Sequence, residues 1–262
     1  MEFENVKFSV EGNVAEVTLN RPQAANAMNL DMMKELAQIA NRCDSNPDIR
    51  AVVLTGEGKM FSAGGDINAF GGLGDDLAFG LKEMTTLFHA SVSRFTRMNA
   101  PLIVAANGMC AGGGMSLAAV GDIVLAADNS AFTMAYTAAA LSPDGSSTYF
   151  LPRRIGDRRT RELMLTNRRI SAQEALDWGL VNAIHPADSL LDEARKLAAQ
   201  LAAGPTLAFG RVKQLLNASF ENGLETQMEL ESRGIADMAA TADTKEGVDA
   251  FLNKRKPVYQ GR

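Results

Sequence analysis

The first twenty residues show apolar side chains at every second position. They do so from Val6 to Val10 and from Val14 to Leu19, on either side of Glu11-Gly12-Asn13. A period of two is typical of β-strands, and a short glycine-containing turn between two such runs predicts a hairpin. Asn20-Arg21-Pro22 then ends the second strand, because proline cannot continue the strand's hydrogen bonding.

A helical period follows, and Asn29 or Asp31 can cap the helix that it predicts. Its apolar face consists of Met33, Leu36, Ala37, Ile39, Ala40 and Cys43. Strand-like and helix-like stretches then alternate. Strands are predicted at 51–55, 102–106 and 123–127, with helices around 81–98 and from Gly114. Alternation at this spacing indicates parallel strands joined by right-handed crossovers, so the predicted fold class is α/β.

Beyond Gly145 the only strand signal is at 181–184. Ser171 opens a capping box, and Gly179 is a plausible helix stop. Further helices are predicted at 189–203, 206–222, 224–240 and 244–253. One small sheet cannot bury both faces of so many helices. We therefore expect an α/β core over residues 1–200 and a helical region over residues 201–262 that packs on neighbouring subunits.

Composition narrows the possible partners. The chain has 262 residues, 46% of them hydrophobic, and a formal net charge of −5, which argues against a nucleic-acid surface as its main function. It contains no apolar run of transmembrane length and no signal-peptide pattern at its start. Its two cysteines have no metal-ligand spacing. We expect a cytoplasmic protein without a metal, a nucleic-acid partner or a membrane partner.

Two glycine-rich turns are the first candidate chemistry. Phe61–Asp66 and Asn107–Gly114 each follow an apolar run of strand type. Glycine lets a backbone N–H approach a ligand closely, and at a helix N-terminus such donors have no partner within the helix. Two such donors that converge on one oxygen atom form an oxyanion hole. The alternative for either turn alone is ordinary packing or turn chemistry.

Several segments together resemble the crotonase, or enoyl-CoA hydratase/isomerase, superfamily over nearly the whole chain. They are Asn20-Arg21-Pro22, the two glycine turns, Leu163–Arg168, Ala175–Val181 and Phe251–Pro257. The resemblance implies a spiral of ββα units with a C-terminal helical trimerisation region, and hence a homotrimer or homohexamer. It also implies an acyl-CoA thioester as substrate, with no cofactor apart from the coenzyme A of that substrate.

The resemblance assigns the oxyanion donors to the N–H groups of Gly65 and Gly113. It places substrate-binding positions at Ala27, Ala63, Gly64, Asp66 and Ile67. It further suggests that Lys254 and Lys256, with Arg255 between them, supply charge to the coenzyme A phosphates across a subunit boundary. The alternative for these three residues is a solvated basic helix end. Gln23 replaces a lysine that is common in the early coenzyme A motif.

Hydratases of this family use two glutamates, and the corresponding positions here are Ser116 and Tyr136. Neither side chain is a carboxylate, so the usual two-glutamate hydration is not expected. Asp144 lies where isomerases and aromatic acyl-CoA dehalogenases of the family keep their working carboxylate. The segment from Leu141 to Arg153 most resembles the epoxyphenylacetyl-CoA isomerase branch. The alternative is that Pro143-Asp144-Gly145 is only a turn or a helix cap.

His89 corresponds to a histidine of the dehalogenases and of related isomerases, and Tyr136 can hydrogen-bond the carboxylate or the substrate. Six large side chains are available for an acyl pocket, although most are expected in the core: Phe61, Phe70, Phe88, Met109, Met134 and Phe150. Gly71–Asp76 suggests either a mobile loop over this pocket or a disordered tip. The predicted function is an acyl-CoA isomerase with Asp144 as proton shuttle. The alternatives are a 4-chlorobenzoyl-CoA dehalogenase-like hydrolase, a hydratase-type enzyme and a non-catalytic acyl-CoA binder.

Overall fold

A larger sheet of six strands forms the base of the molecule. The computed structural model describes residues 3–262, and the strand order in this sheet is β1-β2-β3-β5-β7-β10. The bounds are Val6–Glu11, Val14–Leu19, Ala51–Gly56, Leu102–Ala106, Ile123–Ala127 and Ala183–His185. β1 and β2 form the predicted antiparallel hairpin, and the other neighbours pair in parallel. The α/β class is confirmed.

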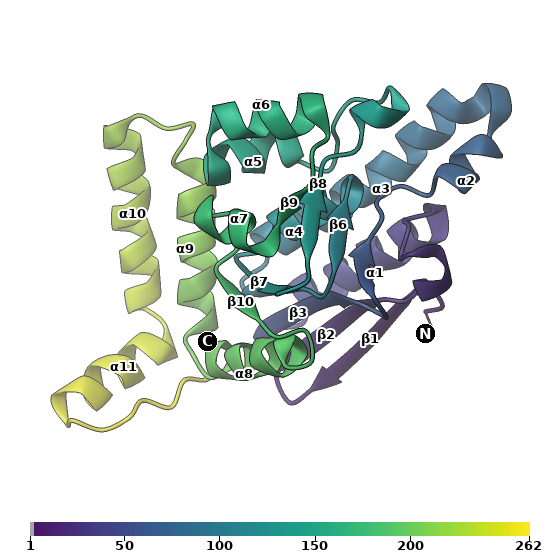
Figure 1. The fold of residues 1–262 in the computed structure, drawn as a ribbon. Coiled ribbons are helices and arrows are strands. Elements are labelled where there is room, and N and C mark those ends of the chain that lie inside the picture. Colours follow the sequence, from purple (N-terminus) through teal and green to yellow (C-terminus); the bar gives the residue numbers. More distant parts are fainter. Residues whose placement is uncertain (1–2) are drawn as a thin grey trace.

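A second, smaller sheet stands on the first (Figure 1). Its order is β4-β6-β8-β9, with bounds Met60–Ser62, Met109–Ala111, Ala131–Thr133 and Ile170–Ser171. β4, β6 and β8 pair in parallel, and each directly follows a strand of the larger sheet along the chain. The chain therefore winds as a spiral of ββα units, as expected. These short strands were not predicted, because three residues are too few to show a period.

Helices cover both faces of the larger sheet. α1 (Leu30–Ser45), α3 (Leu77–Arg97) and α4 (Gly113–Ala119) pack on one face, and α8 (Leu190–Ala202) packs on the other. Asn29, rather than Asp31, caps α1, because its side chain accepts a hydrogen bond of 3.0 Å from the Met32 N–H. α3 begins four residues earlier than the Leu81 of the prediction.

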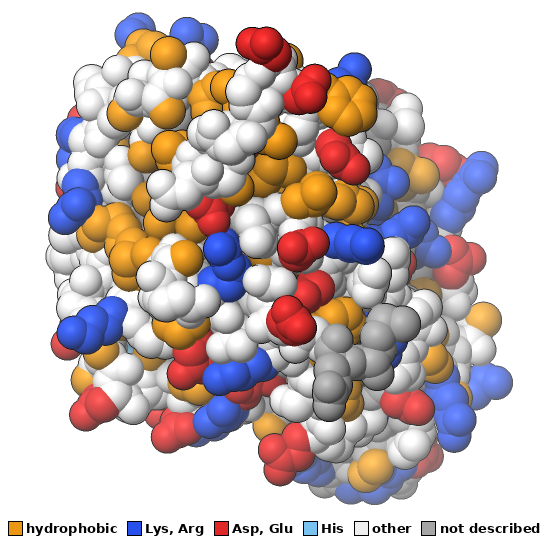
Figure 2. All heavy atoms as spheres, turned by 90° about the vertical axis from the view of Figure 1, so that its right-hand side faces the viewer, with side chains coloured by type: hydrophobic (Ala, Val, Ile, Leu, Met, Phe, Trp, Pro, Cys, Tyr) orange, Lys and Arg blue, Asp and Glu red, His pale blue; other side chains and the backbone are white. Residues whose placement is uncertain are grey.

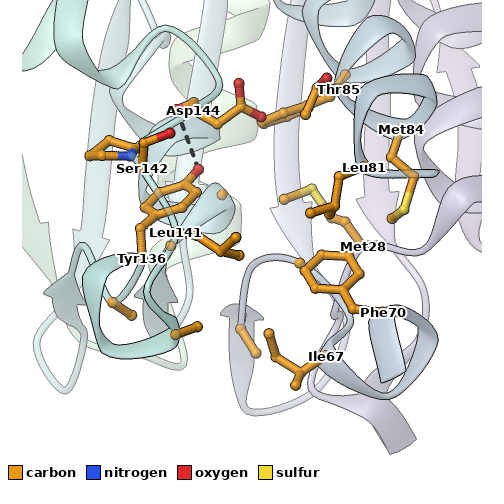
Figure 3. Close-up of a pocket in the computed structure, with 18 of the residues that line it drawn as sticks. Met28, Ile67, Phe70, Leu81, Met84, Thr85, Tyr136, Leu141, Ser142 and Asp144 are labelled. Atoms are coloured by element: carbon orange, nitrogen blue, oxygen red, sulfur yellow. Dashed lines mark hydrogen bonds between the residues drawn. The ribbon is translucent and has the colours of Figure 1, made fainter. Parts of the chain in front are cut away.

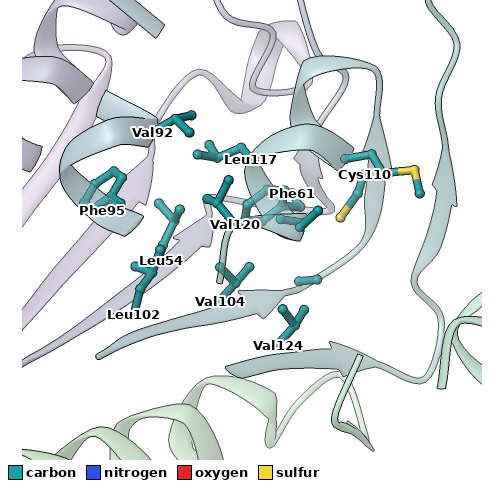
Figure 4. Close-up of a cluster of buried hydrophobic side chains, with 14 of the residues drawn as sticks. Leu54, Phe61, Val92, Phe95, Leu102, Val104, Cys110, Leu117, Val120 and Val124 are labelled. Carbon is teal, nitrogen blue, oxygen red and sulfur yellow. The ribbon is translucent and has the colours of Figure 1, made fainter. Parts of the chain in front are cut away.

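Alternate residues of the central strands point to opposite cores. Val52 and Leu54 belong to the main cluster, whereas Val53 packs with Ala194 and Ala198 of α8. Figure 4 shows part of the main cluster. Both cysteines are buried, and burial, with the charge of Asp44, raises the pKa of the Cys43 thiol to about 12.

Further helices frame the upper part of the molecule. They are α2 (Ile67–Gly71), α5 (Ser147–Ile155), α6 (Asp157–Thr166) and α7 (Ala172–Asp177). Ser171 is the N-cap of α7, because its side chain accepts a hydrogen bond from the Glu174 N–H. The Glu174 carboxylate pairs with Arg168, so only this half of the predicted capping box is confirmed. An irregular loop was predicted at 71–76, and this is wrong. The segment contains the end of α2 and a 3₁₀ turn at Gly74–Asp76. Leu73 packs closely on Gly80 of α3 and fixes this segment.

The last three helices of the chain lie to one side of the sheets, at the left of Figure 1. α9 (Thr206–Ala218), α10 (Leu224–Ala239) and α11 (Ala242–Leu252) lie close to their predicted bounds. Large apolar side chains stay exposed on them and beside them: Val212, Leu216, Phe220, Leu224, Met228, Leu230, Ile235, Val248, Phe251 and Leu252. A single chain leaves these side chains uncovered, but the trimer or hexamer stays a prediction. The proposed boundary at residue 200 lies inside α8.

Candidate active site

A cavity of about 520 Å³ opens between the two glycine turns, the α2–α3 region and the segment 135–144. Figure 3 shows Phe70, Leu81 and Met84 on one side of it, and Tyr136, Leu141 and Ser142 on the other. Of the six side chains proposed for an acyl pocket, Phe70 and Phe88 line it. The structure places Phe61, Met134 and Phe150 in the core instead. Such a mainly apolar wall suits a hydrophobic group.

The two glycine turns touch each other beside this cavity. Gly64 has a φ of +89°, and a Cβ added there would lie 2.6 Å from the Ala111 carbonyl oxygen and 2.9 Å from the Gly113 nitrogen. Only glycine satisfies both the backbone conformation and this close approach. The glycine-rich sequence predicted that the backbone needs glycine here. It could not predict the contact between two turns that are nearly 50 residues apart.

Gly65 and Gly113 both line the cavity, and their N–H groups have no hydrogen-bond partner among residues 3–262. Gly113 is the first residue of α4, where a helix leaves its N–H groups free. A large apolar side chain covers each glycine. A Cβ at Gly65 would lie 2.5 Å from Phe70 Cζ, and one at Gly113 would lie 2.6 Å from Met28 Cε. These two free donors stand in an apolar environment that strengthens their interaction with an anion.

Asp144 faces the same cavity and contacts His89 of α3. Asp144 Oδ1 lies 2.5 Å from His89 Nε2, and the two side chains are 26% and 55% exposed. The N-cap position of α5 belongs to Ser146, and the Asp144 carboxylate does not cap that helix. The structure therefore brings together Asp144, His89, Gly65 and Gly113, which are distant in the sequence.

Ser116 and Tyr136 occupy the places where hydratases are expected to have glutamates, and their hydroxyl oxygens lie 3.0 Å apart. Burial raises the pKa of the Tyr136 phenol well above its ordinary value, so the phenol stays protonated near neutral pH. Both hydroxyls also reach the main-chain carbonyl of Asp144, as does that of Ser147. Sequence reasoning gave no role to Ser147, because a serine after Pro-Asp-Gly has no distinctive signal.

Asp66 has a structural position next to the first glycine turn. Its carboxylate accepts hydrogen bonds from the N–H groups of Asn68 and Ala69 and so caps α2, and it pairs with Arg21 at 2.8 Å. Arg21 also donates to the Ala27 carbonyl. Ala63 and Ile67 line the cavity, whereas Gly64, Asp66 and the buried Ala27 stand behind its wall.

We expect Asp66→Asn to lower the free energy of unfolding by about 1–3 kcal/mol at pH 7, because a largely buried carboxylate–guanidinium pair is lost while a capping side chain remains. Burial by itself raises the pKa of Asp66. The hydrogen bonds from Arg21 and from two backbone N–H groups, with the charge of Arg21, outweigh burial, so the net pKa lies below its ordinary value of 3.8. Stability from this group is therefore present above pH 3.8 and is lost as pH falls through the lower folded pKa.

Urea unfolding at pH 7 and at decreasing pH tests this expectation. The difference between wild type and Asp66→Asn should shrink at acidic pH. Asp157→Asn removes an exposed pair with Arg161 and serves as the control, with little expected change. A constant difference at every pH would contradict the assignment.

The predicted phosphate contacts lie at the other end of the chain. Lys254 and Lys256 are exposed and do not line the cavity that Gly65, Gly113 and Asp144 share. Arg255 pairs with Glu246 at 2.6 Å and with Asp249 at 2.6 Å. Its charge is thus already neutralised locally, and only the two lysines stay available. Their predicted role across a subunit boundary stays a prediction.

The surface on the α2 side mixes charge and apolar groups. Figure 2 shows acidic and basic side chains interspersed on this face, with hydrophobic side chains gathered in its upper half. Ile67, Leu77 and Phe79 are exposed in this region. Within residues 3–262 there is no cluster of three potential metal ligands, and none of the helices is long and apolar enough to cross a membrane.

Comparison with known proteins gives one consistent result. The profile of the enoyl-CoA hydratase/isomerase family matches residues 9–262. The chain is 37% identical to 1,2-epoxyphenylacetyl-CoA isomerase of Escherichia coli and 36% identical to a probable enoyl-CoA hydratase of Rhodobacter capsulatus, with 100% of both chains covered in each case. An enoyl-CoA hydratase structure from Polaromonas superposes with a TM-score of 0.92 at 34% identity, over 97% of this chain and 99% of that one.

Proposed function

Because the chain belongs to the enoyl-CoA hydratase/isomerase family, we propose that it is an acyl-CoA isomerase that moves a double bond from the 3,4 to the 2,3 position of the thioester. The observation that carries this proposal is the single carboxylate of Asp144, which faces the same cavity as the free N–H groups of Gly65 and Gly113.

In the proposed reaction the thioester carbonyl oxygen accepts hydrogen bonds from Gly65 and Gly113. Asp144 removes a proton from C2, and the electrons of that C–H bond move into the carbonyl to form a dienolate. The two N–H groups stabilise the negative oxygen. The protonated Asp144 then returns the proton to C4, the carbonyl re-forms, and the new double bond joins C2 to C3. No atom is gained or lost.

One carboxylate suits a transfer between two carbons on the same face of the substrate. Ser116 and Tyr136 offer no second carboxylate, and the raised pKa of Tyr136 keeps its phenol from acting as a base near neutral pH. The similarity to 1,2-epoxyphenylacetyl-CoA isomerase supports the same interpretation and extends it to acyl groups derived from an aromatic ring. Phe70, Phe88 and Met84 provide an apolar wall against which such a group can pack.

Hydration of a 2-enoyl-CoA is the second candidate. Two observations favour it: a relative described as an enoyl-CoA hydratase, and His89 beside Asp144 as a further proton-transfer group. A water molecule between the substrate and this pair could be activated by one carboxylate and one imidazole. The absence of the usual glutamates places this candidate after the isomerase.

The test is to incubate the protein with a 3-enoyl-CoA and follow the ultraviolet absorbance of the conjugated 2-enoyl thioester, with the product mass and the free thiol recorded. We expect a rise in absorbance, an unchanged mass and no free coenzyme A. In a parallel incubation with a 2-enoyl-CoA, loss of absorbance with a gain of one water would favour hydration. Release of coenzyme A would show thioester hydrolysis instead. Release of chloride from 4-chlorobenzoyl-CoA would favour the dehalogenase-like hydrolase, and binding without turnover would favour the non-catalytic binder.

A further inference from the structure

The main-chain carbonyl of Asp144 is surrounded by three hydroxyl groups. It lies 2.8 Å from Ser116 Oγ, 2.9 Å from Ser147 Oγ and 3.3 Å from the Tyr136 hydroxyl. A carbonyl oxygen has two lone pairs, so the two serines, which are nearer, are its donors. The Tyr136 hydroxyl, 3.0 Å from Ser116 Oγ, then donates to that serine.

Ser116 belongs to the helix that presents an oxyanion donor. It lies three residues after Gly113 in α4, and its N–H donates to the Gly112 carbonyl at 3.0 Å. Its side chain is fully buried. A rigid turn of helix therefore connects the Gly113 N–H to the hydroxyl that holds Asp144.

The segment after Asp144 fits tightly against this helix. Gly145 has a φ of +63°, and a Cβ there would lie 2.9 Å from Ser116 Cβ and 2.3 Å from Phe88 Cε1. The hydroxyl of Ser116 and the packing of Gly145 thus fix the backbone from two sides. Ser147 holds the same carbonyl, but it belongs to α5, and among residues 3–262 no hydrogen bond joins its side chain to the glycine turns.

We propose that Ser116 is a positioning residue, which sets the place of the Asp144 carboxylate relative to the Gly113 N–H, and that Tyr136 orients the Ser116 hydroxyl. This inference rests on the proposed isomerase function. A single base that serves both C2 and C4 must stand at a defined distance from the oxyanion hole, because small displacements from the reactive geometry are costly in rate. At the two positions where hydratases have glutamates, this chain has hydroxyls: that of Ser116 holds the main-chain carbonyl of Asp144, and that of Tyr136 contacts Ser116.

Ser116→Ala tests the proposal, with Ser130→Ala as the matched control. Ser130 is also buried, and its hydroxyl donates to the Ala106 carbonyl at 2.6 Å, away from Asp144. In the isomerisation of a 3-enoyl-CoA, we expect Ser116→Ala to lower kcat about tenfold while KM changes by less than about twofold. Ser130→Ala should leave both constants as in the wild type.

A spectroscopic readout shows which part of the site responds. Polarisation of the carbonyl of bound cinnamoyl-CoA shifts its absorbance to longer wavelength, and this shift should persist in Ser116→Ala because Gly65 and Gly113 keep their N–H groups. Loss of the shift would overturn the proposal, since Ser116 would then support the oxyanion hole rather than Asp144. Cinnamoyl-CoA that still binds with its shift shows that the variant is folded, so a lower kcat then reports the position of Asp144.

A double-mutant cycle tests the link to Tyr136. If Tyr136 acts through Ser116, the variant Ser116→Ala/Tyr136→Phe should lose about as much kcat as Ser116→Ala alone. If the loss of kcat in the double variant equals the product of the losses in the two single variants, the link between Tyr136 and Ser116 is overturned. If the wild type turns over the 3-enoyl-CoA and Ser116→Ala has the same kcat, the positioning role is refuted and the proposed function stands. An inactive wild type would instead refute the function.

Discussion

Asp144→Asn should reduce the isomerisation of a 3-enoyl-CoA by about a thousandfold or more, because general acid–base groups typically contribute factors of about 10² to 10⁴ and this cavity contains one carboxylate. The amide has nearly the shape of the carboxylate but cannot accept and return a proton near neutral pH. Substrate binding should persist, because the apolar wall and the N–H groups of Gly65 and Gly113 are unchanged. Initial rates from the ultraviolet absorbance of the 2-enoyl product, and calorimetric titration with a saturated acyl-CoA, measure the two effects.

Asp128→Asn is the matched control for this substitution. Asp128 is exposed, lies at the end of β7 and does not line the acyl cavity. The control should turn over substrate as the wild type does. Substantial activity in Asp144→Asn would remove Asp144 from the role of base and direct attention to His89 as the alternative proton carrier.

Gly64→Ala should lower kcat/KM by about a hundredfold to a thousandfold, the loss typical of removing an oxyanion-hole donor. The new methyl group would overlap the Ala111 carbonyl and the Gly113 nitrogen, which are backbone atoms and cannot rotate away. The two turns must therefore separate, and their N–H groups can no longer converge on one oxygen. Steady-state kinetics and the absorbance shift of bound cinnamoyl-CoA report this change directly.

Gly156→Ala separates this effect from backbone strain. Gly156 has a φ of +83°, close to the +89° of Gly64, but a Cβ there meets nothing within 4 Å. The control should lose about 1–3 kcal/mol of stability without a comparable loss of activity. Equal catalytic losses in both variants would mean that general destabilisation, and not the contact between the turns, explains the result.

Much of the fold was predictable because it depends on local patterns. The hairpin of β1 and β2, the buried strands β3, β5 and β7, and the C-terminal helices all have periods or apolar runs longer than four residues. The smaller sheet was missed, because β4, β6 and β8 are three residues long, too short to show a period, and their pairing and core packing join residues distant in the sequence. The helical form of 67–76 was missed for a similar reason: glycines weaken the local signal, and packing of Leu73 on Gly80 supplies the missing stability.

The sequence by itself determined which residue types are available for chemistry: two glycine turns, one candidate carboxylate at Asp144, and hydroxyls at Ser116 and Tyr136. Only the tertiary structure decided how they lie relative to one another. In the structure the Asp66 carboxylate caps α2, Arg255 pairs with two local carboxylates, and three hydroxyls surround the Asp144 carbonyl. The reason is physical, because conformational preference acts between neighbours in the chain, whereas contacts such as Gly64 with Gly113 form only when distant strands pair in register.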